Sequence, residues 1–361
     1  MNTFGTYLRL TTFGESHGPA VGGVLDGLPP RLRIDMEDVA REIAARRPGG
    51  RGVSQRRESD TPEFLSGLTR DNLTLGSPIA FIVRNSDARS ADYDAVADRF
   101  RPNHADYTTI ARYGIRDPRG GGRASARETV ARVIAGALTM QWLSAGGIRI
   151  SAALTGAGKV LAENLHRRMA LSGNPSELLD LPLSLQEEMM AEIEKARLDG
   201  DSVGGRVSCV IEGLPAGIGS PVYSKLHARL AEAMMGINAA HAFEYGLGME
   251  LASASGVQTA DRMREGSDGH PLFTTNYSGG IQGGISNGTP VYFSVTFKPT
   301  PSVATPLESV DALGRECIVS TAGRHDPCVA LRAAAVVKAM AALTVGDALL
   351  ENPALCATLL P

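Results

Sequence analysis

The spacing of hydrophobic residues along the chain predicts a mixture of short strands and longer helices. Alternating positions or short apolar runs, typical of strands, occur in 6–13, 20–28, 78–84, 147–156 and 291–297. Apolar residues at helical spacing occur in 34–47, 125–138, 185–198, 222–235 and from about 327 to 350. Residues 160–183 show neither period, so we expect them to be irregular.

One predicted helix follows a loop of glycine and arginine. Three glycines at 120–122 precede Arg123, and Ser125 with Glu128 forms the Ser-x-x-Glu pattern of a helix-capping box. The backbone N–H groups at such a helix start, beside Arg123 and Arg127, would bind an anion such as phosphate. A capped helix whose arginines face solvent explains the pattern equally well.

The same arrangement recurs near the C-terminus. Gly-Arg-His-Asp at 323–326 is followed by Pro327 and a long apolar helix. Asp326 suits the N-cap and Pro327 the first helical position, so we expect the helix to begin there.

A second pair of stretches is more alike. Residues 14–29 align without gaps on residues 200–215, and each copy precedes a predicted helix. We infer one domain with an internal duplication, in which the halves are approximately 1–145 and 146–361. Related halves usually meet at a pseudo-twofold axis, so functional sites are expected at the seam between them.

Both copies begin with Gly-x-Ser-x-Gly, the pattern of the nucleophile elbow of serine hydrolases. Only thirteen residues precede the first copy, too few for the sheet that presents an elbow serine. A strand-to-strand turn accounts for both copies. His17 has no counterpart, because Val203 stands in its place, and it is therefore a candidate for chemistry. A solvated or core histidine is the alternative.

Composition narrows the classes of function. The formal net charge of −3 and the pI near 6.2 argue against a general nucleic-acid binder. Five lysines leave 31 arginines among the 36 basic residues. This bias suits bidentate capture of phosphate and carboxylate, although a GC-rich genome also produces it. Four cysteines without disulfide or metal-site spacing fit a reduced cytoplasm. We expect no signal peptide and no membrane-spanning run.

The basic residues also concentrate in one loop. Six arginines lie between 41 and 57, among them Arg46 and Arg51, with glycines between them. Such a loop is typical of an anion clamp or lid, or of a solvated run of charge.

Three further segments are candidates for a binding site. A turn at 101–107 would present His104 as a proton donor. A glycine-dense loop spans 276–288, and Lys298 ends a predicted strand beside several hydroxyl groups.

In chain order, TTFGESHG, RRPG with QRRE, RPNHADY, GGGRASARET, INAA, GGIQGGIS, KPTPS and GRHDPC extend over almost the whole chain. The ordered set resembles the motifs of chorismate synthases. The resemblance implies an α+β fold, a β-α-β sandwich in which helices pack between antiparallel sheets, and a homotetramer. It also implies a lyase that converts 5-enolpyruvylshikimate 3-phosphate to chorismate in the shikimate pathway. Reduced FMN is the implied cofactor, without net redox change, and NADPH is a candidate reductant.

The resemblance also assigns roles to residues. His17 corresponds to the acid beside the leaving phosphate, and His104 to the histidine that protonates the flavin. Asp326 corresponds to a carboxylate that assists the flavin N5 in removing the proton from carbon. The substrate or NADPH contacts are expected at Arg46, Arg51 and Arg127.

The family's FMN contacts correspond to Arg123, Ala124, Ser125, Asn238, Ala239, Gly283, Lys298, Pro299, Thr300, Pro301, Ser302 and Arg324. The chain departs from the family pattern nearby. Asn103 stands where Gly is usual, and because Asn tolerates positive φ the turn is expected to survive. Pro301 replaces Ser, Ala322 replaces Lys, and Ala-His-Ala at 240–242 replaces Val-Lys-Gly. These changes bear on flavin affinity more than on the type of reaction.

Two other classes of function would use the same loops. A flavin or nucleotide oxidoreductase would consume reductant at every turnover. A regulator that binds a phosphorylated ligand would need the glycine and arginine loops, but not His17, His104 and Asp326 together.

Overall fold

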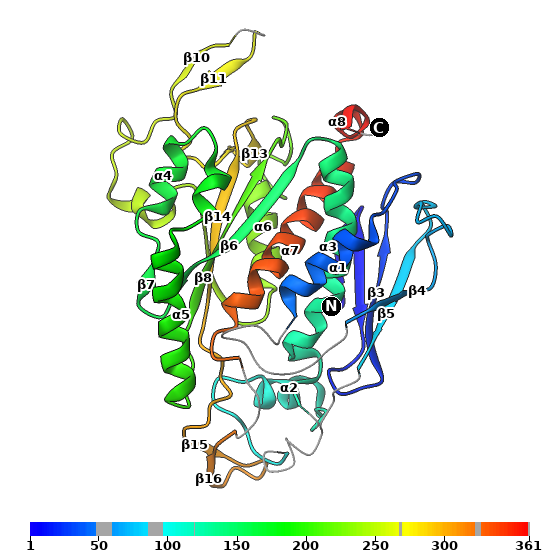
Figure 1. Cartoon of the computed structure of the whole chain (residues 1–361), viewed down its shortest axis with the longest axis vertical. Coiled ribbons are helices and arrows are strands. Elements are labelled where there is room, and N and C mark those ends of the chain that lie inside the picture. The colour runs from blue at the N-terminus through cyan, green and yellow to red at the C-terminus, as the bar shows by residue number, and fades with distance from the viewer. Residues whose placement is uncertain (48–59, 86–96, 119, 267–268, 322–325, 360–361) are drawn as a thin grey trace.

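The computed structural model describes residues 1–361 except 48–59, 86–96, 119, 267–268, 322–325 and 360–361. Two five-stranded antiparallel sheets enclose a layer of helices, and further helices cover the outer face of one sheet (Figure 1). The predicted α+β arrangement, with helices between antiparallel sheets, is confirmed.

The first sheet is formed by the N-terminal part of the chain, in the order β1-β2-β3-β5-β4. Its strands are β1 (Thr3–Phe4), β2 (Arg9–Phe13), β3 (Ala20–Asp26), β4 (Pro62–Phe64) and β5 (Ile79–Arg84). Leu25 of β3 and Phe81 of β5 are completely buried, because alternate residues of these strands face the helix layer.

The second sheet has the order β7-β6-β8-β14-β9. Its strands are β6 (Arg149–Ala157), β7 (Val160–Leu161), β8 (Gly205–Glu212), β9 (Ala240–Tyr245) and β14 (Val291–Phe297). The central strands β8 and β14 are buried along nearly their whole length, since helices lie on both faces of this sheet.

Short two-stranded ribbons extend from this framework. They are β10 (Met263–Glu265) with β11 (Pro271–Phe273), β12 (Ile281–Gln282) with β13 (Ile285–Ser286), and β15 (Leu307–Val310) with β16 (Glu316–Val319).

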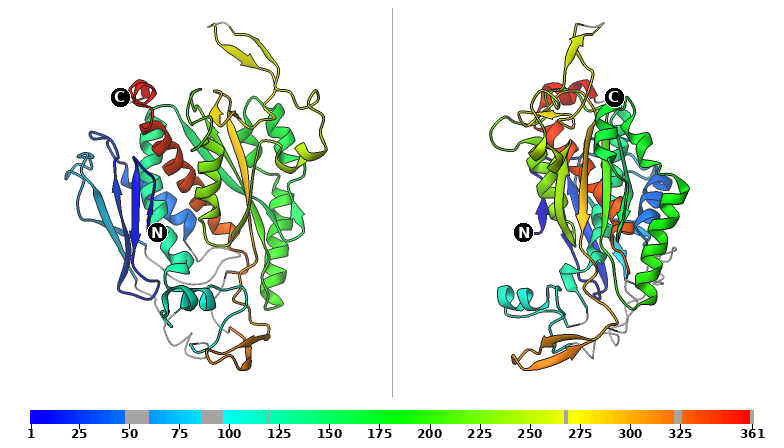
Figure 2. Two further views of the ribbon diagram at one scale, coloured as in Figure 1. Left: turned by 180° about the vertical axis from the view of Figure 1, so that it is seen from behind. Right: turned by 90° about the vertical axis from the view of Figure 1, so that its left-hand side faces the viewer.

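The helix layer contains α1 (Met36–Arg46), α3 (Thr129–Ala145) and α7 (Ala330–Leu350), and α6 (Leu226–Met235) packs on α7 and β9. α3 contacts the first sheet and α7 the second (Figure 2). The two helices approach closely because Gly136 faces Ala339. A Cβ at Gly136 would lie 2.4 Å from the Cβ of Ala339, too close for any larger residue.

Helices α4 (Leu165–Leu171) and α5 (Leu183–Leu198) cover the outer face of the second sheet. The prediction that 160–183 is irregular is therefore wrong. This segment contains β7, α4 and a 3₁₀ turn at Pro175–Leu179. These elements are too short to give a periodic signal, and burial of Leu165 and Met169 against the sheet stabilises them.

Two short helices complete the fold: α2 (Asp106–Tyr113) and α8 (Pro353–Leu359). Among the described residues, α7 is the one helix long and apolar enough to cross a membrane, which corrects the expectation that the chain has no such run. Within its most apolar window 83% of the residues are buried inside the protein, as in the core helix of a globular fold.

The two aligned stretches form strands at equivalent places, β3 and β8, and a helix follows each. The Gly-x-Ser-x-Gly at 14–18 joins two strands, as predicted. The copy at 200–204 follows α5, so it connects a helix to a strand, and the strand-to-strand prediction is wrong there. The division into halves at 1–145 and 146–361 stays a prediction.

Candidate active site

A cavity of about 370 Å³ lies at the end of the molecule where α3 and α7 both begin. Its wall combines six segments that are distant in sequence: the end of α1, the turn before α2, the loop before α3, the residues after α6, the loop after β14, and the start of α7. Two helix N-termini therefore meet at one site, as the two glycine–arginine loops suggested.

Most of the predicted site residues line this cavity. They are Arg46, His104, Ala124, Ser125, Arg127, Asn238, Ala239, Lys298, Thr300, Pro301, Ser302 and Asp326. Arg51 and Arg324 lie outside the described residues. The remaining predicted residues, His17, Arg123, Gly283 and Pro299, are not part of this wall as far as the described chain shows.

The loop before α3 is organised by two 3₁₀ turns, Gly122–Ala124 and Ala126–Glu128. Ser125 caps the second turn by accepting from the backbone N–H of Arg127 at 3.3 Å. Glu128 does not complete the predicted capping box. Its carboxylate lies 2.7 Å from Arg132, while the backbone N–H of Ser125 donates to Gly122. Only the serine half of the box is confirmed.

The start of α7 differs from the prediction. The helix begins at Ala330 with Val329 at the N-cap, so the assignment of Asp326 as N-cap is wrong. The side chain of Asp326 instead accepts from Nη1 of Arg332 at 2.6 Å, and its backbone carbonyl accepts from Thr300 at 2.7 Å. Both partners of this ion pair line the cavity.

The floor of the cavity is a buried arginine pair that shares one carboxylate. Asp60 accepts from Arg46 at 2.9 Å and from Arg127 through its other oxygen. Arg46 is only 1% exposed and also donates to Thr129 and to the carbonyl of Ala126, each at 3.1 Å. Asp60 thereby holds two guanidinium groups side by side beneath the cavity.

Two cations of the wall, Arg101 and Arg332, were missed by the sequence reasoning. Arg332 is the charged residue in the first turn of a mostly apolar helix, and a charge at this position beside the Gly-Arg-His-Asp motif is the signal that could have found it. Arg101 precedes Pro102 in a motif that was assigned to His104 alone.

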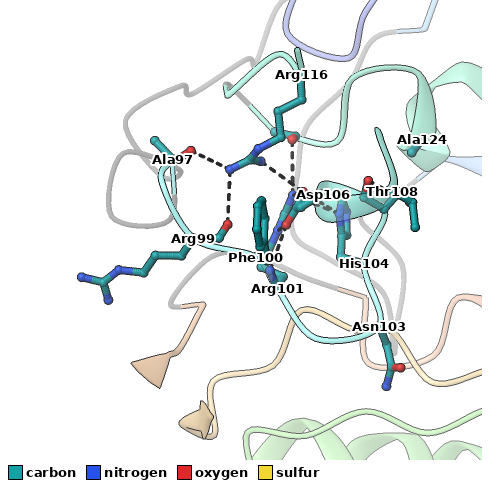
Figure 3. A network of polar contacts seen from close by, with 12 residues as sticks. Ala97, Arg99, Phe100, Arg101, Asn103, His104, Asp106, Thr108, Arg116 and Ala124 are labelled. Carbon is teal, nitrogen blue, oxygen red and sulfur yellow. Dashed lines mark hydrogen bonds and ion pairs between the residues drawn. The ribbon is translucent and has the colours of Figure 1, made fainter. Parts of the chain in front are cut away.

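His104 belongs to a network built on Asp106 (Figure 3). Arg101 donates to both carboxylate oxygens of Asp106 at 2.8 Å, and Arg116 donates to Oδ1 at 3.1 Å. Nδ1 of His104 lies 2.9 Å from the same oxygen. Burial alone would raise the pKa of Asp106, but hydrogen bonds from Arg101 and His104 outweigh it and hold this pKa well below its ordinary value.

Gly120 separates the two candidate histidines. A Cβ on this glycine would lie 2.7 Å from the ring of His17, and its carbonyl accepts from Nη2 of Arg101 at 3.3 Å. Nδ1 of His17 is 3.0 Å from the hydroxyl of Ser16. Gly120 therefore lies against His17 and is linked through Arg101 to His104.

A second cavity of about 970 Å³ adjoins the first, and His104, Ala105, Gly121 and Ala124 line both. Arg123 belongs to this second cavity, where its guanidinium donates to the hydroxyl of Thr12 at 2.6 Å.

The residues after α6 offer an acceptor that the described chain does not satisfy. Asn238 donates to the carbonyl of Ala124 at 2.9 Å, whereas its Oδ1 is buried without a hydrogen-bond partner among the described residues. Ala239 has a φ of +66°, unusual outside glycine. Asn103, at +58°, confirms that its turn tolerates the replacement of the usual glycine.

Gly283 lies at the far end of α6. The carbonyl of Gly284 accepts from the N–H of Leu226 at the first residue of this helix, while Asn238 follows its last turn. Ten helical residues separate these positions by about 15 Å. Within one chain, the structure does not bring Gly283 to the cavity.

Charge dominates the lining of the first cavity. Its cationic side chains are Arg46, Arg101, Arg127, Lys298 and Arg332, whereas Asp326 is the acidic residue among the described lining. Burial lowers the pKa of Lys298. Such a site suits a ligand with several negative charges, and histidine with a carboxylate provides groups that move protons.

The comparisons agree on one family. The family model described as chorismate synthase matches residues 8–350. The chorismate synthase of Porphyromonas gingivalis is 49% identical over 358 residues, which cover 98% of this chain and 96% of the relative. That of Cytophaga hutchinsonii is 47% identical, covering 98% and 99%. A crystal structure of chorismate synthase superposes with a TM-score of 0.72 at 30% identity, covering 96% of this chain and 93% of the other.

Proposed function

Because the chain belongs to the chorismate synthase family of lyases, we propose that it converts 5-enolpyruvylshikimate 3-phosphate to chorismate, within the shikimate pathway of aromatic amino-acid biosynthesis. The reaction is an anti-1,4-elimination, in which phosphate leaves one end of an allylic system and a proton leaves the other. The observation that carries the proposal is the cavity at the starts of α3 and α7, which combines excess positive charge with His104 and Asp326.

Substrate binding follows from the charges. The substrate carries a phosphate and two carboxylates, and the guanidinium groups that line the cavity are matched to such groups. The buried Asp60 fixes Arg46 and Arg127 in place. We propose that Arg127 and Arg332 bind substrate, and that Arg46 acts mainly as the support beneath them.

Proton transfer is assigned to three side chains. We propose that His17 donates a proton to the leaving phosphate, since it adjoins the glycine loop at Gly120. His104 holds a proton at the boundary of the two cavities. Asp326 assists in removing the proton from carbon, and its ion pair with Arg332 orients the carboxylate.

The residues of the first cavity fit reduced FMN. The unsatisfied Oδ1 of Asn238 would accept from a ring N–H, and Lys298 with the hydroxyl groups of Thr300 and Ser302 would bind polar edges of the cofactor. Pro301 provides neither an N–H nor a hydroxyl. When bound, reduced FMN supplies electron density to the breaking C–O bond and recovers it afterwards.

The setting of the enzyme is proposed on the same basis. NADPH is a candidate for reducing the flavin, and the four free cysteines fit a reduced cytoplasm. We also propose a homotetramer. Its support is exposed apolar side chains near the projecting β10–β11 ribbon, such as Met249, Val257 and Leu272. Sedimentation would test the tetramer.

One anaerobic assay tests the reaction. The purified chain is mixed with 5-enolpyruvylshikimate 3-phosphate and FMN reduced beforehand, and both chorismate absorbance and released phosphate are recorded. We expect equal amounts of the two products and no net consumption of reductant. Absence of product would overturn the proposal, and one reductant consumed per turnover would identify an oxidoreductase instead.

A further inference from the structure

Asp106 is a buried carboxylate that no role above accounts for. It stands at the start of α2, and its side chain is 3% exposed. Three residues converge on it: Arg101 with two hydrogen bonds from its guanidinium and one from its backbone N–H, Arg116, and the ring of His104 (Figure 3). The carboxylate therefore connects the histidine to two arginines.

Nδ1 of His104 has two neighbours with opposite requirements. Oδ1 of Asp106 lies 2.9 Å away and can only accept, whereas Nη2 of Arg101 lies 3.2 Å away and can only donate. The two hydrogens of Nη2 are already directed to Oδ1 of Asp106 at 2.8 Å and to the carbonyl of Gly120 at 3.3 Å. Nη2 thus has two other acceptors for its hydrogens, whereas Oδ1 of Asp106 is the nearer neighbour of Nδ1 and can only accept, which favours a proton on Nδ1.

The other ring nitrogen, Nε2, is then the one available for proton exchange in the cavities. Nε2 of His104 has no hydrogen-bond partner within the part of the chain that the structure describes, and the residue lines both cavities. With Nδ1–H fixed, Nε2 carries a lone pair in the neutral ring and a proton in the charged ring.

We propose that Asp106 is a positioning residue that holds the Nδ1–H tautomer of His104, so that Nε2 alone exchanges protons with the cavities. This inference rests on the proposed function. The charged ring gives its Nε2 proton to an acceptor in the first cavity and becomes neutral, while Nδ1–H stays on Asp106. Nε2 then takes a proton from water through the second cavity, which restores the charged ring.

The two arginines have a definite part in this arrangement. Asp106 faces Arg101 and Arg116 in addition to the histidine. With two permanent cations bound, its carboxylate does not accept the Nδ1 proton, because protonation would remove the buried negative charge that both guanidinium groups bind. The proton on Nδ1 is therefore retained throughout the cycle.

The test is a direct reading of the tautomer by NMR. Protein labelled with ¹⁵N-histidine is examined by long-range ¹H–¹⁵N correlation, and the signals of His104 are assigned by their loss in His104→Gln. In the wild type above the pH at which the ring becomes neutral, we expect a protonated Nδ1 and an unprotonated Nε2. The reverse pattern would overturn the proposal, whether or not the protein makes chorismate.

Asp106→Asn removes the charge and keeps the size of the side chain. We expect the neutral ring to change to the Nε2–H form, with kcat reduced by about 10²–10⁴-fold and KM changed by less than about threefold. Unchanged tautomer and unchanged kcat would overturn the proposal. If the variant does not fold, because Arg101 and Arg116 lose their buried counter-ion, the wild-type tautomer alone decides.

Asp347→Asn is the matched control. Asp347 is also buried and bound by an arginine, Arg229, and it accepts from the backbone N–H groups of Tyr7 and Leu8 at 2.6 and 2.8 Å. This carboxylate lies on α7 away from both cavities. The control should lose stability yet keep the His104 signals and kcat of the wild type. A changed tautomer in this control would show that the effect of Asp106→Asn is not local, and would overturn the proposal.

Discussion

Arg46→Met is the substitution that best distinguishes the role that the structure gives Arg46 from the role that the sequence suggested. The sequence suggested that Arg46 belongs to a mobile clamp, so its loss should weaken substrate binding. In the structure the guanidinium donates to Thr129, to the carbonyl of Ala126 and to Asp60, and the residue is almost completely buried. Methionine preserves the apolar stem and removes these three hydrogen bonds. We therefore expect the main effect on stability.

The expected magnitude follows from the contacts. Breaking a buried ion pair costs roughly 3–5 kcal/mol, and the lower value applies because Asp60 keeps Arg127. An unfolding entropy of about 2.1 cal/mol/K per residue over 361 residues is about 0.76 kcal/mol/K. A loss of about 3 kcal/mol then lowers Tm by about 4 °C.

The assay compares thermal unfolding and substrate affinity in the same preparations. Arg229→Met is the control, because Arg229 pairs with Asp347 and Glu351 away from the cavities. Both variants should lose several degrees in Tm, and both should bind substrate within about threefold of the wild type. A direct contact from Arg46 would be worth roughly 1.5–3 kcal/mol, or about 10- to 150-fold in Kd. An unchanged Tm together with such a loss of affinity would refute the buried-support interpretation.

Three further predictions follow from the remaining side chains. His17→Ala should reduce kcat by about 10²–10⁴-fold with little change in KM, and turnover within about threefold of wild type would remove its role as an acid. Asp326→Asn should lower turnover at least about tenfold. It should also lower Tm, because the carboxylate pairs with Arg332 instead of capping a helix. Normal turnover would leave Asp326 a purely structural residue. Burial, and secondarily the charge of Arg206, lowers the pKa of His166 from 6.5 to about 4. As the pH falls, the unfolded chain therefore binds a proton at this histidine at a higher pH than the folded chain does. The free energy of unfolding should fall by up to about 1.4 kcal/mol per pH unit between these two pKa values, about 3 kcal/mol in all. Denaturant unfolding at several pH values measures this slope, and an unchanged slope in His166→Asn would contradict the assignment.

The strongly periodic elements of the fold were predictable from the sequence. β14 occupies the predicted residues 291–297, and α5 begins within two residues of its predicted start. The segment 160–183 was not predictable, because its elements are short and are stabilised by contacts with strands and helices that are distant in sequence. The spacing of hydrophobic residues along the chain reveals an element only where that element is long enough to bury one regular face of its own.

The candidate site was predictable in its loops and less so in its ion pairs. Glycine-rich motifs located the walls of the cavity, since their backbone requirements are local. The sharing of Asp60 by Arg46 and Arg127 joins residues that are far apart in sequence, and no spacing rule connects them. The misplaced cap at Asp326 has a different cause: Arg332, in the first turn of the same helix, binds the carboxylate that the capping rule assigned to the helix start.

The two helix starts at the cavity supply different chemistry although their loops look alike. The start of α3 provides Ser125, which caps a turn of the loop, and Arg127, which carries a positive charge. The start of α7 provides Asp326, which carries a negative charge held by its own arginine. An elimination needs both, because one end of the substrate loses an anion and the other loses a proton. The predicted duplication would place two related helix starts at one seam, and divergence of their polar residues would then assign one chemical task to each end of the reaction.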